Sequence, residues 1–461
     1  MTTSKTFQLG CLLLAVFSLS SCTKLPDVAE IIDESPTGRA RIVSSQGALS
    51  HRESAAMLER LKRSVHPTDL LKRHTAIVES VTNSPLTGGN KVTLLADGPA
   101  TYAAMFKAIR EARHHINLES YIIEDDATGR KFADLLLKKQ AGGVRVHVIY
   151  DSMGSINTPD SFFQRLRDGG IEVAEFNPVN PTKPGESWSP THRDHRKILI
   201  ADGKTAIIGG VNISEVYSSR PGKRKKSKKA PIHWRDTDIH IEGPAVAELQ
   251  KLFLDTWLKQ KGSKLPGRDF FPNPKETGSA LVRVVGSTPG QTNRIPFVVY
   301  VSAISLAEHS VHLTNSYFIP DEQIVTALTE AARRGVDVKL VLPGVTDSKL
   351  AYYAQRYHYS ELLKAGVKIY EHKTSLLHAK TAVIDSVWST VGSTNMDFLS
   401  MLNNDEVNAV ILSKDFASEM EKMFARDLAN CRPIELQEWE KRPLLPKLRE
   451  WFFSYLFARW L

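Results

Sequence analysis

The stretch Asp194-His195-Arg196-Lys197, followed by Asp202, has a second version in Leu377-His378-Ala379-Lys380, followed by Asp385. In both versions a lysine stands two residues after the histidine, and an aspartate stands seven residues after it. Each version closes with a glycine and an asparagine, in Gly209-Gly210-Val211-Asn212 and in Gly392-Ser393-Thr394-Asn395. A His–Lys pair that recurs with the same spacing predicts one active site assembled from two similar halves.

The repeat extends beyond the motif. Three further segments recur in the same order: 117–123 with 313–319, 141–148 with 333–340, and 170–173 with 366–369. From Lys91 onward, short apolar runs typical of strands alternate with helical patterns. This alternation predicts an α/β protein whose sheets are covered by helices, with two homologous domains at 91–270 and 271–430.

The net charge favours anionic partners. The chain has 461 residues, a formal charge of +9 and 42% hydrophobic residues, which describes a basic globular protein. Phospholipid surfaces and nucleic acid both fit this charge, and the charge by itself does not choose between them. Seven of the ten residues at 220–229 are basic, which predicts a solvated loop, with attraction to phosphate or lipid headgroups as the alternative.

The N-terminus predicts a bacterial lipoprotein. An apolar run at 9–19 is too short for a comfortable membrane span and has the form of a signal peptide, assigned to 1–21. Leu19-Ser20-Ser21-Cys22 resembles a lipobox, so Cys22 is the expected site of lipidation; an ordinary signal sequence or an uncleaved anchor is the alternative. Because Thr23 and not an aspartate follows, we expect attachment to the periplasmic side of a bacterial membrane, with the outer membrane favoured.

Two terminal segments flank the repeat. Residues 22–90 are mostly polar with an amphipathic stretch at 54–71, and we interpret them as a membrane tether. Residues 431–461 form an amphipathic tail. Its stretch 444–461 combines Arg449 and Arg459 with the large side chains of Trp451, Phe452, Phe453, Tyr455, Leu456, Phe457 and Trp460. A helix at the membrane interface and a helix packed on the domain both fit this composition. Cys431, the remaining cysteine, is interpreted as a buried inert thiol.

The motif residues suit phosphodiester chemistry. On a strand, His195 and Lys197 point to the same face, as do their counterparts His378 and Lys380. The lysines would neutralise the non-bridging oxygens, and Asn212 and Asn395 would donate hydrogen bonds as charge builds. One imidazole can attack phosphorus while the other protonates the departing alkoxide. This chemistry requires no metal or other cofactor, and Asp202 and Asp385, which lie at strand ends, are interpreted as structural.

The duplicated pattern resembles the phospholipase D superfamily. The resemblance implies two homologous α/β sandwich domains of the phospholipase D type, with the active site at their interface. It also implies that His195 is the nucleophile, forming a phosphohistidine, and that His378 is the general acid and base, although the residues also permit the reverse. In that family a carboxylate downstream of each motif orients the histidine of the other half. Glu406 is the candidate for His195, and Asp236, with Asp238 as a competitor, is the candidate for His378.

Within the superfamily, the segments 121–126, 194–197, 209–212, 234–237 and 377–381 resemble bacterial cardiolipin synthases. The resemblance implies a phosphatidyltransferase that acts on membrane phospholipids, with phosphatidylglycerol or phosphatidylethanolamine as substrates and without nucleic acid as a partner. Hydrolysis, as a phospholipase D or a periplasmic nuclease, is the alternative activity. A lipid-binding lipoprotein with a vestigial site is a third reading, which the intact motifs oppose. Gly210 departs from the serine common at its position. The oligomeric state stays open.

Overall fold

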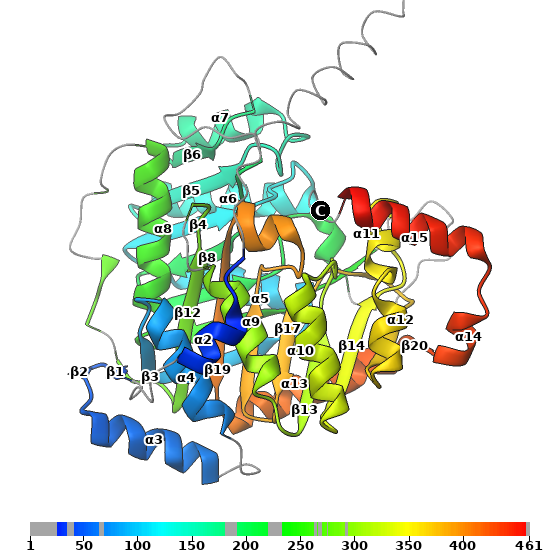
Figure 1. Cartoon of the computed structure of the whole chain (residues 1–461). Coiled ribbons are helices and arrows are strands. Elements are labelled where there is room, and N and C mark those ends of the chain that lie inside the picture. Colours follow the sequence, from blue (N-terminus) through cyan, green and yellow to red (C-terminus); the bar gives the residue numbers. More distant parts are fainter. Residues whose placement is uncertain are drawn as a thin grey trace, which may run out of the picture.

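The computed structural model describes residues 25–34, 41–63, 69–179, 191–219, 233–261, 265, 270–273, 275–290 and 294–457. Figure 1 shows mixed sheets covered by helices, with segments from both halves of the chain meeting in the middle. The α/β prediction with two similar halves is confirmed, because each half repeats the same order of strands and helices.

The first half contains one mixed sheet with helices on both faces. Its strands are β3 (Leu86–Leu95), β4 (His115–Ser120), β5 (Arg145–Asp151), β6 (Glu172–Phe176), β8 (Lys197–Ala201), β9 (Thr205–Gly209) and β11 (Asp238–Glu242). Its helices are α5 (Gly98–Glu111), α6 (Ala127–Ala141), α7 (Asp160–Asp168) and α8 (Val246–Lys261). Hydrogen bonds order the strands as β6–β5–β4–β8–β9–β11–β3.

The second half repeats this order. Its strands are β12 (Ala280–Ser287), β13 (Ser310–Thr314), β14 (Asp337–Pro343), β15 (Lys368–His372), β17 (Thr381–Ile384), β18 (Trp388–Gly392) and β19 (Asn404–Leu412). Its helices are α9 (Ile295–Ser305), α10 (Glu322–Arg333), α11 (Lys349–Arg356), α12 (Tyr359–Lys364) and α13 (Lys414–Leu428). The strand order is β15–β14–β13–β17–β18–β19–β12, the same arrangement as in the first half.

The two halves share one central core. Strand β12 pairs with β3, which joins the two sheets. Between the sheets, apolar side chains from β8, β9, β12 and β19 pack with those of α8 and α13. A second core lies under α5, α6 and α7, and a third under α9, α10 and α12. Apolar surface is therefore buried across the junction of the two halves. This shared core holds the halves together in one orientation.

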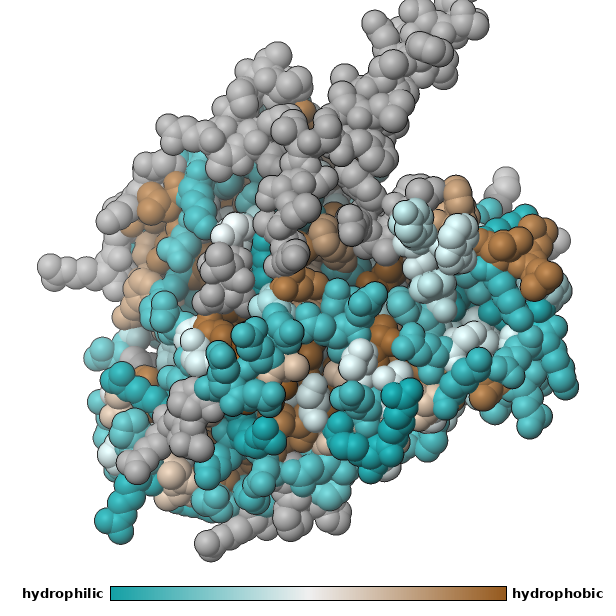
Figure 2. All heavy atoms as spheres, in the orientation of Figure 1, coloured by the Kyte–Doolittle hydropathy of each residue, from teal (hydrophilic) through white to brown (hydrophobic). Residues whose placement is uncertain are grey.

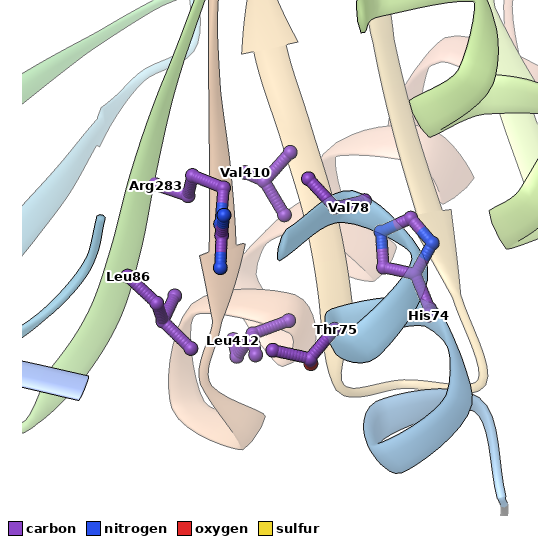
Figure 3. Close-up of a pocket in the computed structure, with 7 residues that line it drawn as sticks. All are labelled: His74, Thr75, Val78, Leu86, Arg283, Val410 and Leu412. Atoms are coloured by element: carbon purple, nitrogen blue, oxygen red, sulfur yellow. The ribbon is translucent and has the colours of Figure 1, made fainter. Parts of the chain in front are cut away.

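The segment interpreted as a tether contains packed structure. It forms α2 (Val28–Glu34), β1 (Ile42–Ser44), β2 (Gly47–Ala48), α3 (His51–Arg63) and α4 (Leu70–Val81). Helix α4 buries Leu70, Leu71 and Ile77 in the core of the second half, against α9. His74, Thr75 and Val78 of α4 line a small cavity, with Arg283 of β12 on the opposite side (Figure 3). This cavity contains none of the motif residues and lies apart from the site described below.

The C-terminal segment packs at the edge of the second half. Strand β20 (Cys431–Ile434) extends the second sheet beside β15, and α14 (Leu436–Glu440) and α15 (Leu444–Phe457) follow. Figure 1 shows α15 lying against α11. Cys431 is buried and unpaired. Among the residues that the structure describes, no helix combines the length and apolar character needed to cross a bilayer.

Candidate active site between the two halves

His195 of the first half is positioned by the strand that carries Glu406 of the second half. The short strand β7 (Arg193–Asp194) runs parallel to the start of β19, with Asp194 beside Asp405. The His195 backbone N–H donates to the Asp405 carbonyl at 2.9 Å. The His195 Nδ1 atom then lies 3.0 Å from both carboxylate oxygens of Glu406. Because Nδ1 is engaged, Nε2 is the nitrogen left for chemistry.

His378 is positioned in the same way by the first half. The strand β16 (Leu376–Leu377) runs parallel to β10 (Trp234–Arg235), and the His378 N–H donates to the Arg235 carbonyl at 2.7 Å. His378 Nδ1 lies 2.6 Å from Asp236 Oδ2. The competing candidate, Asp238, instead accepts the Val211 N–H at 3.0 Å. The structure thus places Asp236, and not Asp238, at His378.

Both motif lysines are buried. Lys197 Nζ donates to the carbonyl of His195, and Lys380 Nζ donates to the carbonyl of His378. Burial lowers the pKa of Lys197 to about 7 and that of Lys380 to about 8, and for Lys197 the charge of Lys380 adds to the effect. Two ammonium groups that influence each other belong to one site, although they come from different halves of the chain.

The electrostatics of the histidine–carboxylate pairs also cross the halves. Burial lowers the pKa of His195, and burial together with the Lys380 charge lowers that of His378 to about 4. Burial by itself would raise the pKa of Glu406 and Asp236, but the hydrogen bonds from the adjacent imidazoles and the lysine charges outweigh it and lower both. Two neutral imidazoles, each facing an ionised carboxylate, describe the site without substrate.

The two motif asparagines have different environments. The Asn212 side chain accepts the Ile122 N–H at 3.1 Å and donates to the Tyr217 hydroxyl at 3.0 Å. The Asn395 carbonyl oxygen accepts a hydrogen bond from the Ser316 hydroxyl at 2.7 Å. Asn212 therefore orients the adjacent loop and Tyr217. The amide nitrogen of an asparagine carries two N–H donors, so Asn212 can keep the bond to Tyr217 and also donate to a phosphoryl oxygen.

Gly210 and Ser393 occupy equivalent positions beside the two carboxylates. The Ser393 hydroxyl donates to Glu406 Oε2, which fixes that carboxylate in addition to its contact with His195. A Cβ atom at Gly210 would lie 2.2 Å from Asp236 Oδ1. The first half thus has no room for a serine here, because the carboxylate itself occupies the space.

The motif aspartates lie at turns away from the histidines. Asp202 accepts the backbone N–H groups of 113–115, and Asp385 accepts those of 308–310. Both have positive φ, 56° for Asp202 and 50° for Asp385. Each carboxylate binds the N-terminal end of the neighbouring central strand to the hairpin that follows the motif, which is a structural function.

Aromatic residues that the motif analysis did not assign surround the imidazoles. The Tyr121 ring meets the His195 ring edge-on at 5.1 Å, and Trp234 lies 4.8 Å from His378. The Tyr317 ring lies 6.4 Å from His378, edge-on, and the Tyr217 hydroxyl is 3.5 Å from His378 Nδ1. The repeat already contained a signal for Tyr121 and Tyr317, which stand at matching positions of the two halves. Tyr217 had none.

Two predicted features fall on segments that the structure does not describe. Cys22, the expected lipidation site, precedes the first described residue. The basic stretch 220–229 lies within the gap between Ser219 and His233.

Comparisons with known proteins agree with this geometry. Two segments of the chain, 105–220 and 300–428, match a family described as "Cardiolipin synthase, PLD-like domain". The chain belongs to this family. Together with the intact paired site, the match identifies the chain as a phosphatidyltransferase of the phospholipase D type.

Individual relatives cover most of the chain. A cardiolipin synthase of Geobacillus thermodenitrificans is 35% identical over 399 residues, which are 86% of this chain and 77% of the relative. Cardiolipin synthase A of Pseudomonas fluorescens is 36% identical over 366 residues, 79% of this chain and 74% of the relative. Among solved structures, phosphatidylserine synthase of Haemophilus influenzae shares the fold, with a TM-score of 0.57, 12% identity, and coverage of 80% of this chain and 93% of the synthase.

Proposed function

We propose that this chain transfers a phosphatidyl group from one phosphatidylglycerol molecule to a hydroxyl of another, which forms cardiolipin and releases glycerol. Phosphatidylethanolamine is the second donor that fits the chemistry. The observation that carries the proposal is the exchanged pairing, in which each histidine is held through Nδ1 by a carboxylate of the other half. The names of the relatives support phospholipids as the substrate class.

In the first step, Nε2 of neutral His195 attacks phosphorus. A nitrogen–phosphorus bond forms while the bond from phosphorus to the glycerol oxygen breaks, and protonated His378 gives its proton to that oxygen. The lowered pKa of His195 keeps it neutral and nucleophilic near neutral pH. A bound phosphodiester anion counteracts the positive charge of Lys380, which raises the pKa of His378 and favours the protonated form that this step needs.

In the second step, neutral His378 removes the proton from a hydroxyl of the acceptor lipid. The acceptor oxygen attacks phosphorus, the nitrogen–phosphorus bond breaks, and His195 is regenerated. Glu406 and Asp236 keep both imidazoles in the tautomer with the proton on Nδ1, and they stabilise the charge that each ring carries in turn. Lys197 and Lys380 neutralise the non-bridging oxygens in both steps.

We also propose that acyl-Cys22 attaches the protein to the periplasmic face of the outer membrane. The lipobox-like sequence ending at Cys22 supports this placement. Metabolic labelling with a radioactive fatty acid tests it. Label on the wild type and none on Cys22→Ser is the expected result, whereas equal labelling of both contradicts the assignment.

The activity test uses purified protein and vesicles that contain phosphatidylglycerol labelled in its acyl chains. Labelled cardiolipin with release of glycerol is the expected result, and phosphatidic acid as the only product would show hydrolysis and overturn the transfer proposal. His195→Ala and His378→Ala should each lose more than about 10³-fold in turnover, since each removes a reacting group. His51→Ala, which changes an exposed histidine on α3, is the matched control and should keep wild-type turnover.

The roles of the two histidines can be separated with a phosphatidyl ester of p-nitrophenol. This leaving group departs without a proton, so the first step no longer needs the general acid. His378→Ala should then accumulate phosphatidyl label on the protein, while His195→Ala should accumulate none. The opposite pattern would assign nucleophilic attack to His378.

A further inference from the structure

Helix α15 has its polar side toward the protein. Glu450 and Ser454 are buried against the second half. Glu450 is held by Arg442, at 2.6 and 3.0 Å, and by Arg356 of α11, at 3.2 Å. Ion pairs and hydrogen bonds thus fix this side of the helix, together with Phe453, which stacks on Tyr353 of α11.

The opposite side of α15 is apolar and exposed. Leu444 is 75% exposed, Leu448 59%, Trp451 52% and Tyr455 76%, and Leu445 and Phe452 are exposed beside them. These positions recur every three to four residues, so they form one continuous face. Figure 2 shows brown and pale spheres along the outer side of the helix that Figure 1 labels α15. A surface helix normally buries its apolar face, and this orientation is the reverse.

Helix α15 lies at the same end of the second half as the active site. The Tyr317 ring is edge-on to His378, and its hydroxyl donates to Asp347 at 2.8 and 2.9 Å. Asp347 immediately precedes the N-cap residue of α11, Ser348, and α11 packs along α15. A short series of direct contacts therefore connects the imidazole to the helix.

In the first half, the loop after β5 corresponds to the loop after β14 in the second half, and it also exposes apolar side chains. Met153 and Ile156 follow β5 and are 38% and 58% exposed. In the same loop, the Ser155 hydroxyl donates to the carbonyl of Tyr121, the residue whose ring meets His195. On the second half, Leu350 and Tyr357 of the α11 region are exposed as well. Apolar groups thus flank the site on both halves.

We propose that the apolar face of α15, together with the loop at Met153 and Ile156, docks into the lipid surface of a membrane and presents the active site to phospholipid headgroups. Leucines with interfacial Trp and Tyr, and with Lys447 and Arg449 on the same helix, suit the headgroup region of a bilayer. One face of a 14-residue helix is small compared with a stable dimer interface, which buries about 1,600 Å² in total. The inference rests on the proposed function in one respect, that the substrate lies in a membrane.

The test measures binding of the full chain to phosphatidylglycerol–phosphatidylcholine vesicles by flotation. Every variant also carries Cys22→Ser, so that acylation does not contribute, and the buffer contains about 0.5 M salt to screen the basic segments. Leu448→Glu/Trp451→Glu should bind at least about tenfold more weakly than the parent, because charged side chains are unfavourable in the interface. Leu258→Glu, on an exposed leucine of α8, is the matched control and should bind as the parent does.

Two further measurements keep the proposal testable if the double variant folds poorly. Brominated phospholipids should quench the fluorescence of the parent, and Trp451→Phe, which preserves the apolar face, should lose most of this quenching while it still binds. The ratio of turnover on vesicles to turnover on monomeric short-chain phosphatidylglycerol should fall at least about tenfold in the glutamate variant.

The docking proposal would be overturned if Leu448→Glu/Trp451→Glu bound vesicles as tightly as the parent does. It would also be overturned if Trp451→Phe were quenched as strongly as the parent. A parent that sediments as a dimer and a glutamate variant that sediments as a monomer would identify a second copy of the chain as the occupant and would also overturn it. Failure of the proposed function would give a different result, because the parent would then turn over phosphatidylglycerol neither in vesicles nor as short-chain monomers. Vesicle binding and quenching would still test the docking of α15.

Discussion

Lys197 and Lys380 combine two demands that oppose each other. Both must be charged to neutralise a phosphodiester, yet both lie in a buried site next to each other's charge. Burial lowers the pKa of Lys197 to about 7 and that of Lys380 to about 8. A bound phosphate anion reverses part of this effect, since it stabilises both ammonium groups. The site therefore has its full positive charge in the complex with substrate.

The lysines predict a specific pH profile. For the free enzyme, the decline of kcat/KM that follows deprotonation of His378 should become steeper as the pH rises from about 7 to 8, because a neutral lysine no longer attracts the substrate anion. For kcat the decline should begin at higher pH, since bound phosphate raises both pKa values. Initial rates on monomeric short-chain phosphatidylglycerol between pH 6 and 10 measure the decline of kcat and that of kcat/KM. Identical alkaline limbs for kcat and kcat/KM would contradict this account.

The space around position 210 explains why the chain has glycine there and not the serine that is common at this position. The sequence showed only that Gly210 stands where serine is the more common residue. The structure shows that Asp236 fills the space that a side chain at 210 would need. In the second half, Ser393 fits because its hydroxyl donates to Glu406. The two carboxylates are therefore supported differently, although they serve equivalent histidines.

At the scale of elements, α4 is attached to the second half by a buried polar contact. Trp388 Nε1–H donates to His74 Nε2 at 3.0 Å, so His74 carries its proton on Nδ1, which lies 3.0 Å from the Ser302 hydroxyl. Burial, with a smaller contribution from Arg283, lowers the pKa of His74 to about 3. A protonated His74 could not accept from Trp388, so the packed helix requires the neutral imidazole.

This contact predicts an acid-dependent loss of stability. The folded-state pKa of His74 lies below its unfolded value near 6.5, so the unfolded chain binds the proton first and stability falls as the pH drops below 6.5. The contribution is about 1.4 kcal/mol per pH unit, or about 2 kcal/mol between pH 6.5 and 5. His74→Gln removes the titration and should show a correspondingly shallower dependence in urea unfolding. Parallel pH dependences of the two proteins would exclude His74 as the titrating group.

The tether interpretation illustrates what an element's sequence conceals. Residues 54–71 show an amphipathic pattern, but the pattern does not reveal which partner covers the apolar side. In the structure, Leu70 and Leu71 enter the core formed by α9 and its neighbours. Helix α15 shows the converse, because its composition permitted both packing and membrane contact until its exposed and buried faces were known.

At the scale of the whole molecule, the two halves exchange the groups that orient their histidines. Each histidine follows a two-residue strand that pairs with the other half: β7 pairs with β19, which carries Glu406, and β16 pairs with β10, which ends one residue before Asp236. The central core between α8 and α13 holds this exchange in place. Each motif histidine takes its orienting carboxylate from the other half, so the site exists only when the halves are docked.

Double-mutant cycles test this exchange. Asp236→Asn should lower turnover by about 10²-fold or more in the wild type, through loss of the His378 orientation, and should have little further effect in His378→Ala. Combined with Glu406→Gln, which acts on the other histidine, the losses should multiply. Turnover of labelled phosphatidylglycerol provides the measurement, and thermal unfolding checks that each variant folds. A further large loss from Asp236→Asn in His378→Ala would show that Asp236 does not act through His378.

The sequence by itself determined the repeat, the α/β architecture and the His–Lys chemistry, because these depend on local periodicity and on residue types at fixed spacing. It also narrowed the orienting carboxylates to Glu406 and either Asp236 or Asp238. Only the tertiary structure decided between the aspartates, brought Tyr217 to His378, and turned the apolar face of α15 outward. Those outcomes depend on contacts between residues more than one hundred positions apart, or on which side of a helix the core covers. Neither leaves a local pattern in the sequence.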